Sequence, residues 1–299
     1  MAEYKGIKGF KVQSLASDPT ADEGQIWYNT TSSALKYDAV AAGAWSSGGN
    51  INNTRADGQG AGASSSSGLY IAGQPSTYAQ QLEEYDGTSW TVSPQSLSTN
   101  HWNGTASGTK ASAIMISGNP GPTVNCEIWD GSTWTETGNV TTGRNNAYTS
   151  IAGPVTATLV ATGNNPPTLN VELFNGTAWT ESTNVNEGKR GGEGAGTQTD
   201  CLIWSGYPSA YGTEKWNGTS WTELTDMGTS RYHFGSLGAT STAAIGAGGT
   251  YPPGNRLTIV ESWNGSSWTE IADLSSEREG QGAAGTAVTG YVVSGLGPA

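Results

Sequence analysis

Histidine and cysteine are nearly absent from this chain of 299 residues, which has two of each. With only His101 and His233, no histidine-based catalytic triad and no histidine-rich metal site is evident. Cys201 lies in the apolar run 200–204, and Cys126 occupies a different place in the repeat described below. We therefore expect two free thiols, no catalytic set, no metal and no cofactor.

Positive charge is also scarce, since 13 Lys and Arg face 25 Asp and Glu and the net charge is −12. A protein that binds nucleic acid or anionic lipid needs a basic surface, so both partners are disfavoured. No apolar run is long enough to span a membrane, and residues 1–6 lack the apolar core of a signal peptide. We expect synthesis in a cytoplasm and, if the protein works outside it, export by another route, such as inside a virus particle.

Helical periodicity is missing too, because no long segment places apolar residues 3.6 positions apart. Glycine is abundant instead, at 44 residues, and Ser, Thr and Asn fill much of the remainder. This composition is typical of many short strands joined by turns, so we predict an all-β protein with almost no helix.

One unit recurs along the chain: a glutamate, an aromatic residue two positions later, an Asn-Gly or Asp-Gly turn, and a tryptophan. The clearest copy is 214–223, and Asn-Gly is a strong signal for a tight hairpin. Other copies lie at 83–90, 127–134, 172–179 and 261–268, with a degraded copy at 35–45. A spacing of about 45 residues is typical of a four-stranded propeller blade.

Two further segments complete each repeat. A basic residue follows the tryptophan by roughly ten positions and precedes a run of small residues such as 58–63, which we interpret as the strand nearest the axis. An apolar run ending in glycine, such as 113–118, predicts a strand buried on both faces. The hairpin then supplies the two outer strands.

Counting these units predicts a six-bladed β-propeller over residues 31–299 and an N-terminal arm over residues 1–30. The closing blade would take its inner strands from 278–297 and its outer strands from 35–45, which removes the last open edge. Gln25–Asn29 and Tyr291–Ser294 both fit its second strand, and the sequence does not decide between them.

The repeat resembles the kelch repeat. An apolar run ending in glycine, a variable loop, an aromatic residue with Asp or Asn, a later Trp and an Arg all match it, and 226–231 resembles its closing segment particularly well. The similarity covers roughly 34–299 and implies a propeller with four-stranded blades. The chain departs from the family at the Gly-Gly pair, which only Gly248-Gly249 shows.

The N-terminal stretch 23–31, with Leu35-Lys36-Tyr37, is similar to segments of bacteriophage tail fibres and other virion proteins, notably of marine phages. This resemblance implies a virion component. The arm would then attach the protein to other virion proteins.

The repeated side chains are predicted to be structural. The tryptophans recur once per blade, as packing between blades requires, although stacking on sugars is the alternative: Trp45, Trp90, Trp134, Trp179, Trp221 and Trp268. The glutamates are expected to form buried or rim hydrogen bonds to backbone or to a basic residue: Glu83, Glu127, Glu172, Glu214 and Glu261. The basic residues should surround one channel mouth, where they either tie blades together or bind an anionic sugar: Arg55, His101, Arg144, Arg190, Arg231 and Arg278.

The loops between the second and third strands, and those between blades, do not repeat. Varied loops on a fixed scaffold are a common place for recognition. We predict ligand binding on this loop face through aromatic residues suited to stacking on sugars or to a protein contact: Tyr78, Trp102, Tyr207, Tyr211, Tyr232, His233 and Tyr251. Plain solvent-exposed loops are the alternative.

The sequence therefore predicts a non-enzymatic phage tail-fibre or appendage protein that recognises a host-surface glycan or protein. Many weak contacts would be multiplied by copy number on the virion. The alternatives are a capsid or tail decoration protein, a carbohydrate-active propeller enzyme and a cellular kelch-type scaffold.

Overall fold

We describe a computed structural model of the chain, covering residues 13–15, 26–31, 33–37 and 44–299 except 165–166, 209–211, 252–253 and 298–299. The chain divides into two compact units, Met1–Ala44 and Trp45–Ala299. No helix in the described part of the chain is long and apolar enough to cross a membrane.

The first unit contains a three-stranded sheet of β1 (Gln13–Leu15), β2 (Ile26–Asn29) and β3 (Ala34–Tyr37). β1 runs parallel to β2, and β2 runs antiparallel to β3, with Ile26 opposite Tyr37. The predicted place of residues 35–37 in a sheet with 278–297 is wrong, because β3 belongs to the sheet of β1 and β2, which contains no strand from that segment. The predicted boundary at residue 30 falls in the turn between these two strands.

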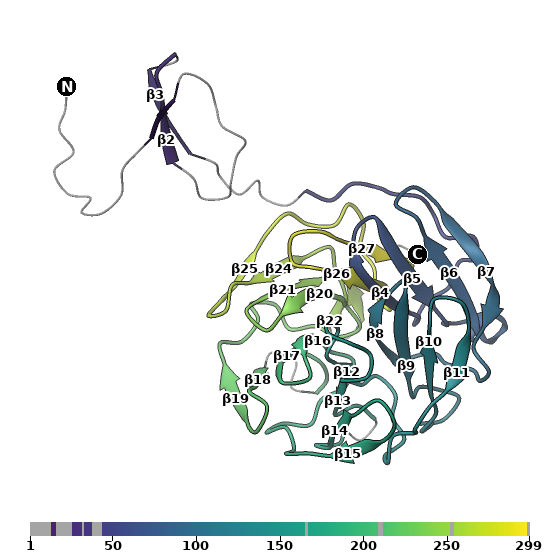
Figure 1. The fold of residues 1–299 in the computed structure, drawn as a ribbon. Helices are drawn as coiled ribbons and strands as arrows, with labels where there is room; N and C mark the ends of the chain where they lie inside the picture. Colours follow the sequence, from purple (N-terminus) through teal and green to yellow (C-terminus); the bar gives the residue numbers. More distant parts are fainter. Residues whose placement is uncertain are drawn as a thin grey trace. The chain divides into compact units, whose positions relative to one another are not determined.

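The second unit is a β-propeller with five four-stranded antiparallel sheets in a ring (Figure 1). The strands of the first three are β4 (Gln59–Ser64), β5 (Ser67–Ile71), β6 (Gln81–Tyr85), β7 (Trp90–Ser96); β8 (Thr105–Thr109), β9 (Ser112–Ile116), β10 (Cys126–Trp129), β11 (Trp134–Glu136); β12 (Tyr148–Thr149), β13 (Leu159–Ala161), β14 (Val171–Phe174) and β15 (Trp179–Glu181). The other two comprise β16 (Glu193–Thr197), β17 (Asp200–Trp204), β18 (Thr213–Trp216), β19 (Trp221–Leu224); β20 (Gly235–Thr240), β21 (Ala243–Ala247), β24 (Val260–Trp263) and β25 (Trp268–Glu270). The predicted strand order within a blade is confirmed.

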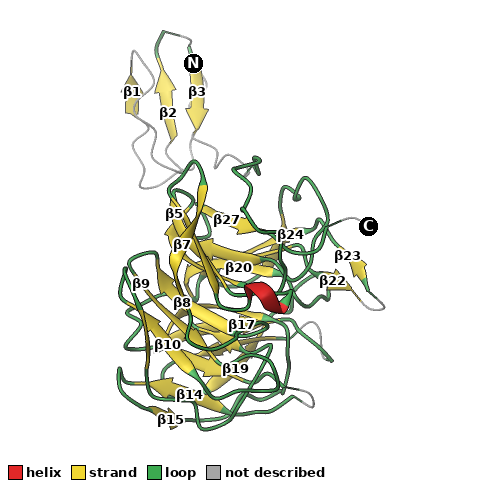
Figure 2. Cartoon of the chain, turned by 90° about the vertical axis from the view of Figure 1, so that its right-hand side faces the viewer, coloured by secondary structure: helices red, strands yellow, loops and turns green. Residues whose placement is uncertain are grey.

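Two smaller sheets accompany these five. β22 (Thr250–Tyr251) and β23 (Asn255–Arg256) form a hairpin inserted in the loop between β21 and β24, and β26 (Gly282–Gly285) pairs with β27 (Gly290–Val293). The one short helix of the described chain is the 3-10 turn η1 (Ser76–Tyr78), seen in red in Figure 2.

The innermost strands form the wall of the axis. β4, β8, β12, β16, β20 and β26 each lie beside the next, and β26 lies beside β4, so the ring is continuous. Small residues are needed here because neighbouring backbones nearly touch. A Cβ on Gly60 of β4 would overlap the backbone of Ala283 in β26.

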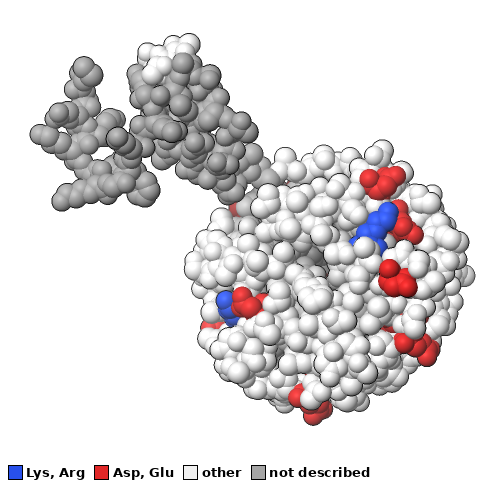
Figure 3. All heavy atoms as spheres, viewed as in Figure 1, with Lys and Arg blue, Asp and Glu red and all other residues white. Residues whose placement is uncertain are grey.

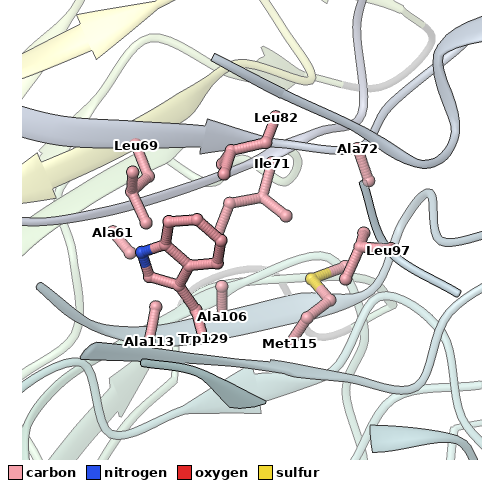
Figure 4. Close-up of a cluster of buried hydrophobic side chains, with 10 residues drawn as sticks. All are labelled: Ala61, Leu69, Ile71, Ala72, Leu82, Leu97, Ala106, Ala113, Met115 and Trp129. Carbon is pink, nitrogen blue, oxygen red and sulfur yellow. The ribbon is translucent and has the colours of Figure 1, made fainter. Parts of the chain in front are cut away.

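Hydrophobic clusters fill the spaces between neighbouring blades. In Figure 4, Trp129 of β10 packs with Leu69, Ile71 and Leu82 of the preceding blade and with Met115 of its own. Trp129 is 1 % exposed, so most of its large apolar surface is removed from water, a gain on the order of 2–3 kcal/mol. The first aromatic residue of the hairpin thus contributes to blade packing as well as the second.

Candidate functional site

The five repeated glutamates are buried where neighbouring blades meet. Glu172 is typical: one carboxylate oxygen accepts the backbone N–H of Thr141 at 2.6 Å, and the other accepts that of Thr142 at 3.3 Å and the guanidinium of Arg144. Arg144 also donates to the carbonyls of Thr162 at 2.9 Å and Asn170 at 3.0 Å. The carboxylate therefore joins the end of one blade to the middle of the next.

The same arrangement recurs with small variations. Burial alone would raise the pKa of Glu83, but hydrogen bonds from Asn52 and Arg55 lower it, and those from His101, Ser98 and Thr99 lower the pKa of Glu127 in the same way. The described ion pairs at these places are Arg55–Glu83, His101–Glu127, Arg144–Glu172, Lys189–Glu214 and Arg231–Glu261. We call these the Glu–base pairs.

Two members of the predicted basic ring behave differently. Lys189, and not Arg190, fills the repeat position in the fourth blade, with its ammonium 3.5 Å from Glu214. Arg278 has no glutamate partner among the described residues; it donates to the carbonyl of Ser294 and the hydroxyl of Ser276. The Glu–base pairs are buried where neighbouring blades meet, so they do not line a channel mouth as the sequence predicted.

A closed ring of backbone hydrogen bonds surrounds the axis, which the sequence analysis missed. The ring consists of the residue two positions after the basic residue of each repeat: Asp57, Asn103, Asn146, Gly191, His233 and Gly280. All six have a positive φ, between 51° and 68°, and each donates its backbone N–H to the backbone carbonyl of the residue before it in the ring. The donor–acceptor distances are 2.6–2.9 Å, and Asp57 closes the ring onto Gly280 at 2.7 Å. Asp, Asn, His and Gly tolerate this conformation best, which is the signal that could have located the ring.

This axial ring borders a narrow polar cavity of about 30 Å³, which Glu193 and Gln281 also line. Burial raises the pKa of Glu193 to about 8, and burial together with Glu279 raises the pKa of Asp57 to about 6. This shift favours the protonated form of Glu193, which can donate a hydrogen bond. No group of three or more His, Cys, Asp or Glu that could hold a metal occurs in the described part of the chain.

A second cavity of about 140 Å³ lies at the far ends of the inner strands. Its walls are mostly apolar, from residues such as Ala63, Ile151, Ala152 and Ala239. It carries no titratable side chain among the residues that line it. Both free cysteines are buried away from these cavity walls, and burial raises the pKa of Cys126 to about 12.

The structure brings three of the predicted loop-face residues into contact. The rings of Tyr207 and Tyr232 lie 6.0 Å apart and those of Tyr232 and His233 lie 4.9 Å apart, both edge-on. The guanidinium carbon of Arg190 lies 5.3 Å from the centre of the Tyr207 ring. We call these four residues the loop-face cluster; Tyr207 is 43 % exposed.

The other predicted loop residues are more scattered. Tyr78 in η1 and Trp102 are half-buried, and neither makes a ring contact within the described chain. Tyr251 is exposed on β22, one residue beyond Thr250, whose backbone pairs with Tyr232. Tyr211 lies outside the described residues.

Charge on the propeller is sparse and local. On the face in Figure 3, Lys and Arg side chains appear as isolated spots beside acidic groups, with no continuous basic patch among the residues drawn in colour. This pattern offers no footprint for a polyanionic phosphate backbone.

No known protein family and no curated protein matches this sequence. The propeller does match the solved structure of YjhT, with a TM-score of 0.66 over 84 % of this chain and 93 % of that chain, at 10 % identity. The fold is similar to that of YjhT, a kelch-repeat protein. At this identity the likeness extends to the fold alone.

Proposed function

We propose that the propeller has six blades, the sixth built from β26, β27 and the segment 45–53. The indole N–H of Trp45 donates to the carbonyl of Ala272 at 3.0 Å, four residues after Trp268. Trp179 and Trp221 make the same bond, to the residue four positions after the preceding blade's tryptophan. Trp45 thus occupies the place of a hairpin tryptophan, although no strand of the described chain precedes it there.

Two further contacts support this closure. The backbone N–H groups of Asn52 and Asn53 donate to Glu83, just as those of Thr141 and Thr142 donate to Glu172. At the other end of the chain, the hydroxyl of Ser294 donates to the carbonyl of Arg55. Both ends of the propeller segment thus contact the first blade, and in this proposal Tyr291–Ser294 forms the second strand of the closing blade.

We propose that this propeller is a non-enzymatic recognition module of a phage virion, binding a host-surface glycan or protein with its loop face. The observation that carries the proposal is the loop-face cluster, in which the exposed ring of Tyr207 meets the half-buried Tyr232 and an arginine on loops whose side chains differ from blade to blade. Aromatic rings with a polar group nearby are typical of recognition surfaces. The repeated Trp and Glu side chains, by contrast, are occupied in holding blades together.

The virion location is supported by the similarity of residues 23–31 to phage tail-fibre segments. In this proposal residues 1–30 bind other virion proteins. Immunogold labelling of purified particles with an antibody to the full chain tests it: label on tails is expected, label on the capsid favours a decoration role, and unlabelled particles overturn the virion assignment.

Recognition is tested separately, with the full chain displayed in many copies on beads. Beads carrying the intact chain should adhere to host cells, whereas beads carrying Tyr207→Ala should not. Val288→Ala is the control, because Val288 is 89 % exposed in the β26–β27 turn, outside the loop-face cluster. Equal adhesion by all three chains, or adhesion by none, would exclude loop-face recognition.

One observation favours a second candidate, a carbohydrate-active enzyme. A carboxyl group with a pKa of about 8 is protonated at neutral pH and has the state of a general acid. Glu193, however, already accepts a hydrogen bond from Ser236 at 3.1 Å and lines a cavity of only about 30 Å³. Turnover of a host polysaccharide by the intact chain, lost in Glu193→Gln, would establish the enzyme.

A further inference from the structure

Arg190 differs from the basic residues of the Glu–base pairs. Each of those faces a glutamate, whereas Arg190 has no carboxylate within ion-pair distance among the described residues. Its Nε is buried without a hydrogen-bond partner in the described chain. The cause lies in the sequence: Lys189 fills the position that pairs with Glu214, which leaves the adjacent arginine free of that role.

The position of Arg190 is fixed by its backbone. Arg190 N–H donates to the carbonyl of Tyr207 at 3.0 Å, and Tyr207 N–H donates back to Arg190 at 2.9 Å. This two-way bridge holds the guanidinium over the ring of Tyr207, and Tyr207 in turn meets Tyr232. A cation is therefore held against an exposed aromatic surface before any ligand arrives, which lowers the entropic cost of binding.

The nearby acidic groups do not neutralise this cation. Glu187 pairs with Lys189 at 3.4 Å, and Glu279 pairs with Arg256 at 3.1 Å. Both carboxylates thus have other partners, and the half-buried guanidinium of Arg190 is left without a carboxylate among the described residues.

We propose that the loop-face cluster binds an anionic sugar residue, with Arg190 holding the acidic group and Tyr207 and Tyr232 contacting the sugar ring. The proposal rests on the recognition role proposed above and names its ligand class. A guanidinium binds a carboxylate or sulfate through two parallel hydrogen bonds, and an aromatic face suits the C–H face of a pyranose. A single cation beside apolar rings fits one anionic group on a ring better than a chain of phosphates, which needs many cations.

Binding of defined saccharides to the full chain tests this. Oligogalacturonate and its methyl ester share one ring and differ in charge, and dextran sulfate and dextran provide the corresponding sulfate pair. The oligogalacturonate or the dextran sulfate should bind, and the neutral saccharide of the same pair should bind at least tenfold more weakly. Whichever anionic saccharide binds more tightly shows whether the recognised group is a carboxylate or a sulfate.

Variants at Arg190 then assign the effect. Arg190→Gln should weaken binding of the anionic member roughly 10- to 100-fold, the range for a hydrogen bond to a charged group. The affinity of Arg190→Lys should lie between those of the intact chain and Arg190→Gln, because lysine keeps the charge and loses the planar guanidinium group. Lys215→Gln is the control: it also removes one positive charge, that of the ammonium 3.2 Å from Asp200, and it should leave the affinity for the saccharide unchanged. Melting temperatures verify that each variant is folded.

The outcomes separate this inference from the proposed function. If a neutral sugar binds as well as its anionic partner and depends on Tyr207 but not on Arg190, recognition stands and the anionic ligand is wrong. If Arg190→Gln leaves anionic binding unchanged, the inference is also wrong. If the intact chain binds neither these saccharides nor host cells, both the recognition role and the anionic ligand are wrong.

Discussion

Replacing Glu172 by glutamine changes one buried charge with almost no change in shape. The glutamine oxygen can still accept from Thr142 and Arg144, but its NH₂ group then faces the N–H of Thr141, which loses its acceptor. An unsatisfied buried donor costs about 1–3 kcal/mol, and a buried cation that loses its partner costs about 3–5 kcal/mol. Since both side chains are fully buried, we expect the free energy of unfolding to fall by about 3–5 kcal/mol.

Urea denaturation followed by tryptophan fluorescence measures this change, and the melting temperature should fall by roughly 10 °C. Glu181→Gln is the matched control, because Glu181 lies opposite Glu172 in the register and is exposed. It should change stability by no more than about 0.5 kcal/mol. Adding Arg144→Gln to Glu172→Gln should cost less than the sum of the two single changes, since the stranded charge is removed. A loss below about 1 kcal/mol for Glu172→Gln would refute the structural role of the Glu–base pairs.

Three other predictions concern closure, the axis and pH. Trp45→Ala should lower the free energy of unfolding in urea by about 2–4 kcal/mol, because it removes the hydrogen bond to Ala272 and the packing of the closing blade. An unchanged denaturation midpoint would show that Trp45 is not part of the closing blade. Gly194→Ala should destabilise by more than about 2 kcal/mol, since its Cβ would overlap the backbone of Thr149 in the neighbouring inner strand; equal melting temperatures would contradict this close approach. Glu193 is protonated in the folded chain up to a pKa of about 8 and ionises near 4.5 when unfolded, so its contribution to stability is complete below pH 4.5 and is lost as the pH rises through 8. Glu193→Gln should therefore flatten the fall in stability between pH 5 and 8.5, and parallel pH profiles for both chains would show that Glu193 is not buried in this way.

The blade architecture was predictable because each blade contains the same short sequence repeat. An Asn-Gly or Asp-Gly turn between two aromatic residues marks each outer hairpin, and the apolar run before it marks a strand buried on both faces. These signals depend only on local turn chemistry and burial, so they survive in copies as different as 172–179 and 214–223.

The N-terminal error arose because residues 35–37 imitate the first half of that hairpin. Their strand pairs instead with β2, with Asn29 opposite Ala34. Trp45 belongs to the propeller unit, where its indole N–H donates to the carbonyl of Ala272. Local pattern cannot distinguish two partners for a short strand, because register and pairing depend on distant residues.

The candidate site was harder to predict. Spacing alone could not decide between Lys189 and Arg190, because the residue two positions later is a glycine in both cases and glycine tolerates positive φ. In the structure it is Gly191 that has the positive φ, at 68°. Because Lys189 fills the repeat position, Arg190 lies on the loop face, where its guanidinium contacts the ring of Tyr207 and adds a positive charge to the cluster. Which of the predicted aromatic residues meet is a tertiary property, and Tyr207 and Tyr232 lie on different loops.

Recognition by the loop-face cluster is best tested by binding of the full chain to a panel of neutral and anionic glycans in multivalent display. The intact chain should bind at least one anionic glycan, and a chain carrying both Tyr207→Ala and Tyr232→Ala should bind none at an unchanged melting temperature. Equal binding by the two chains, or no binding by the intact chain at any valency, would contradict the claim.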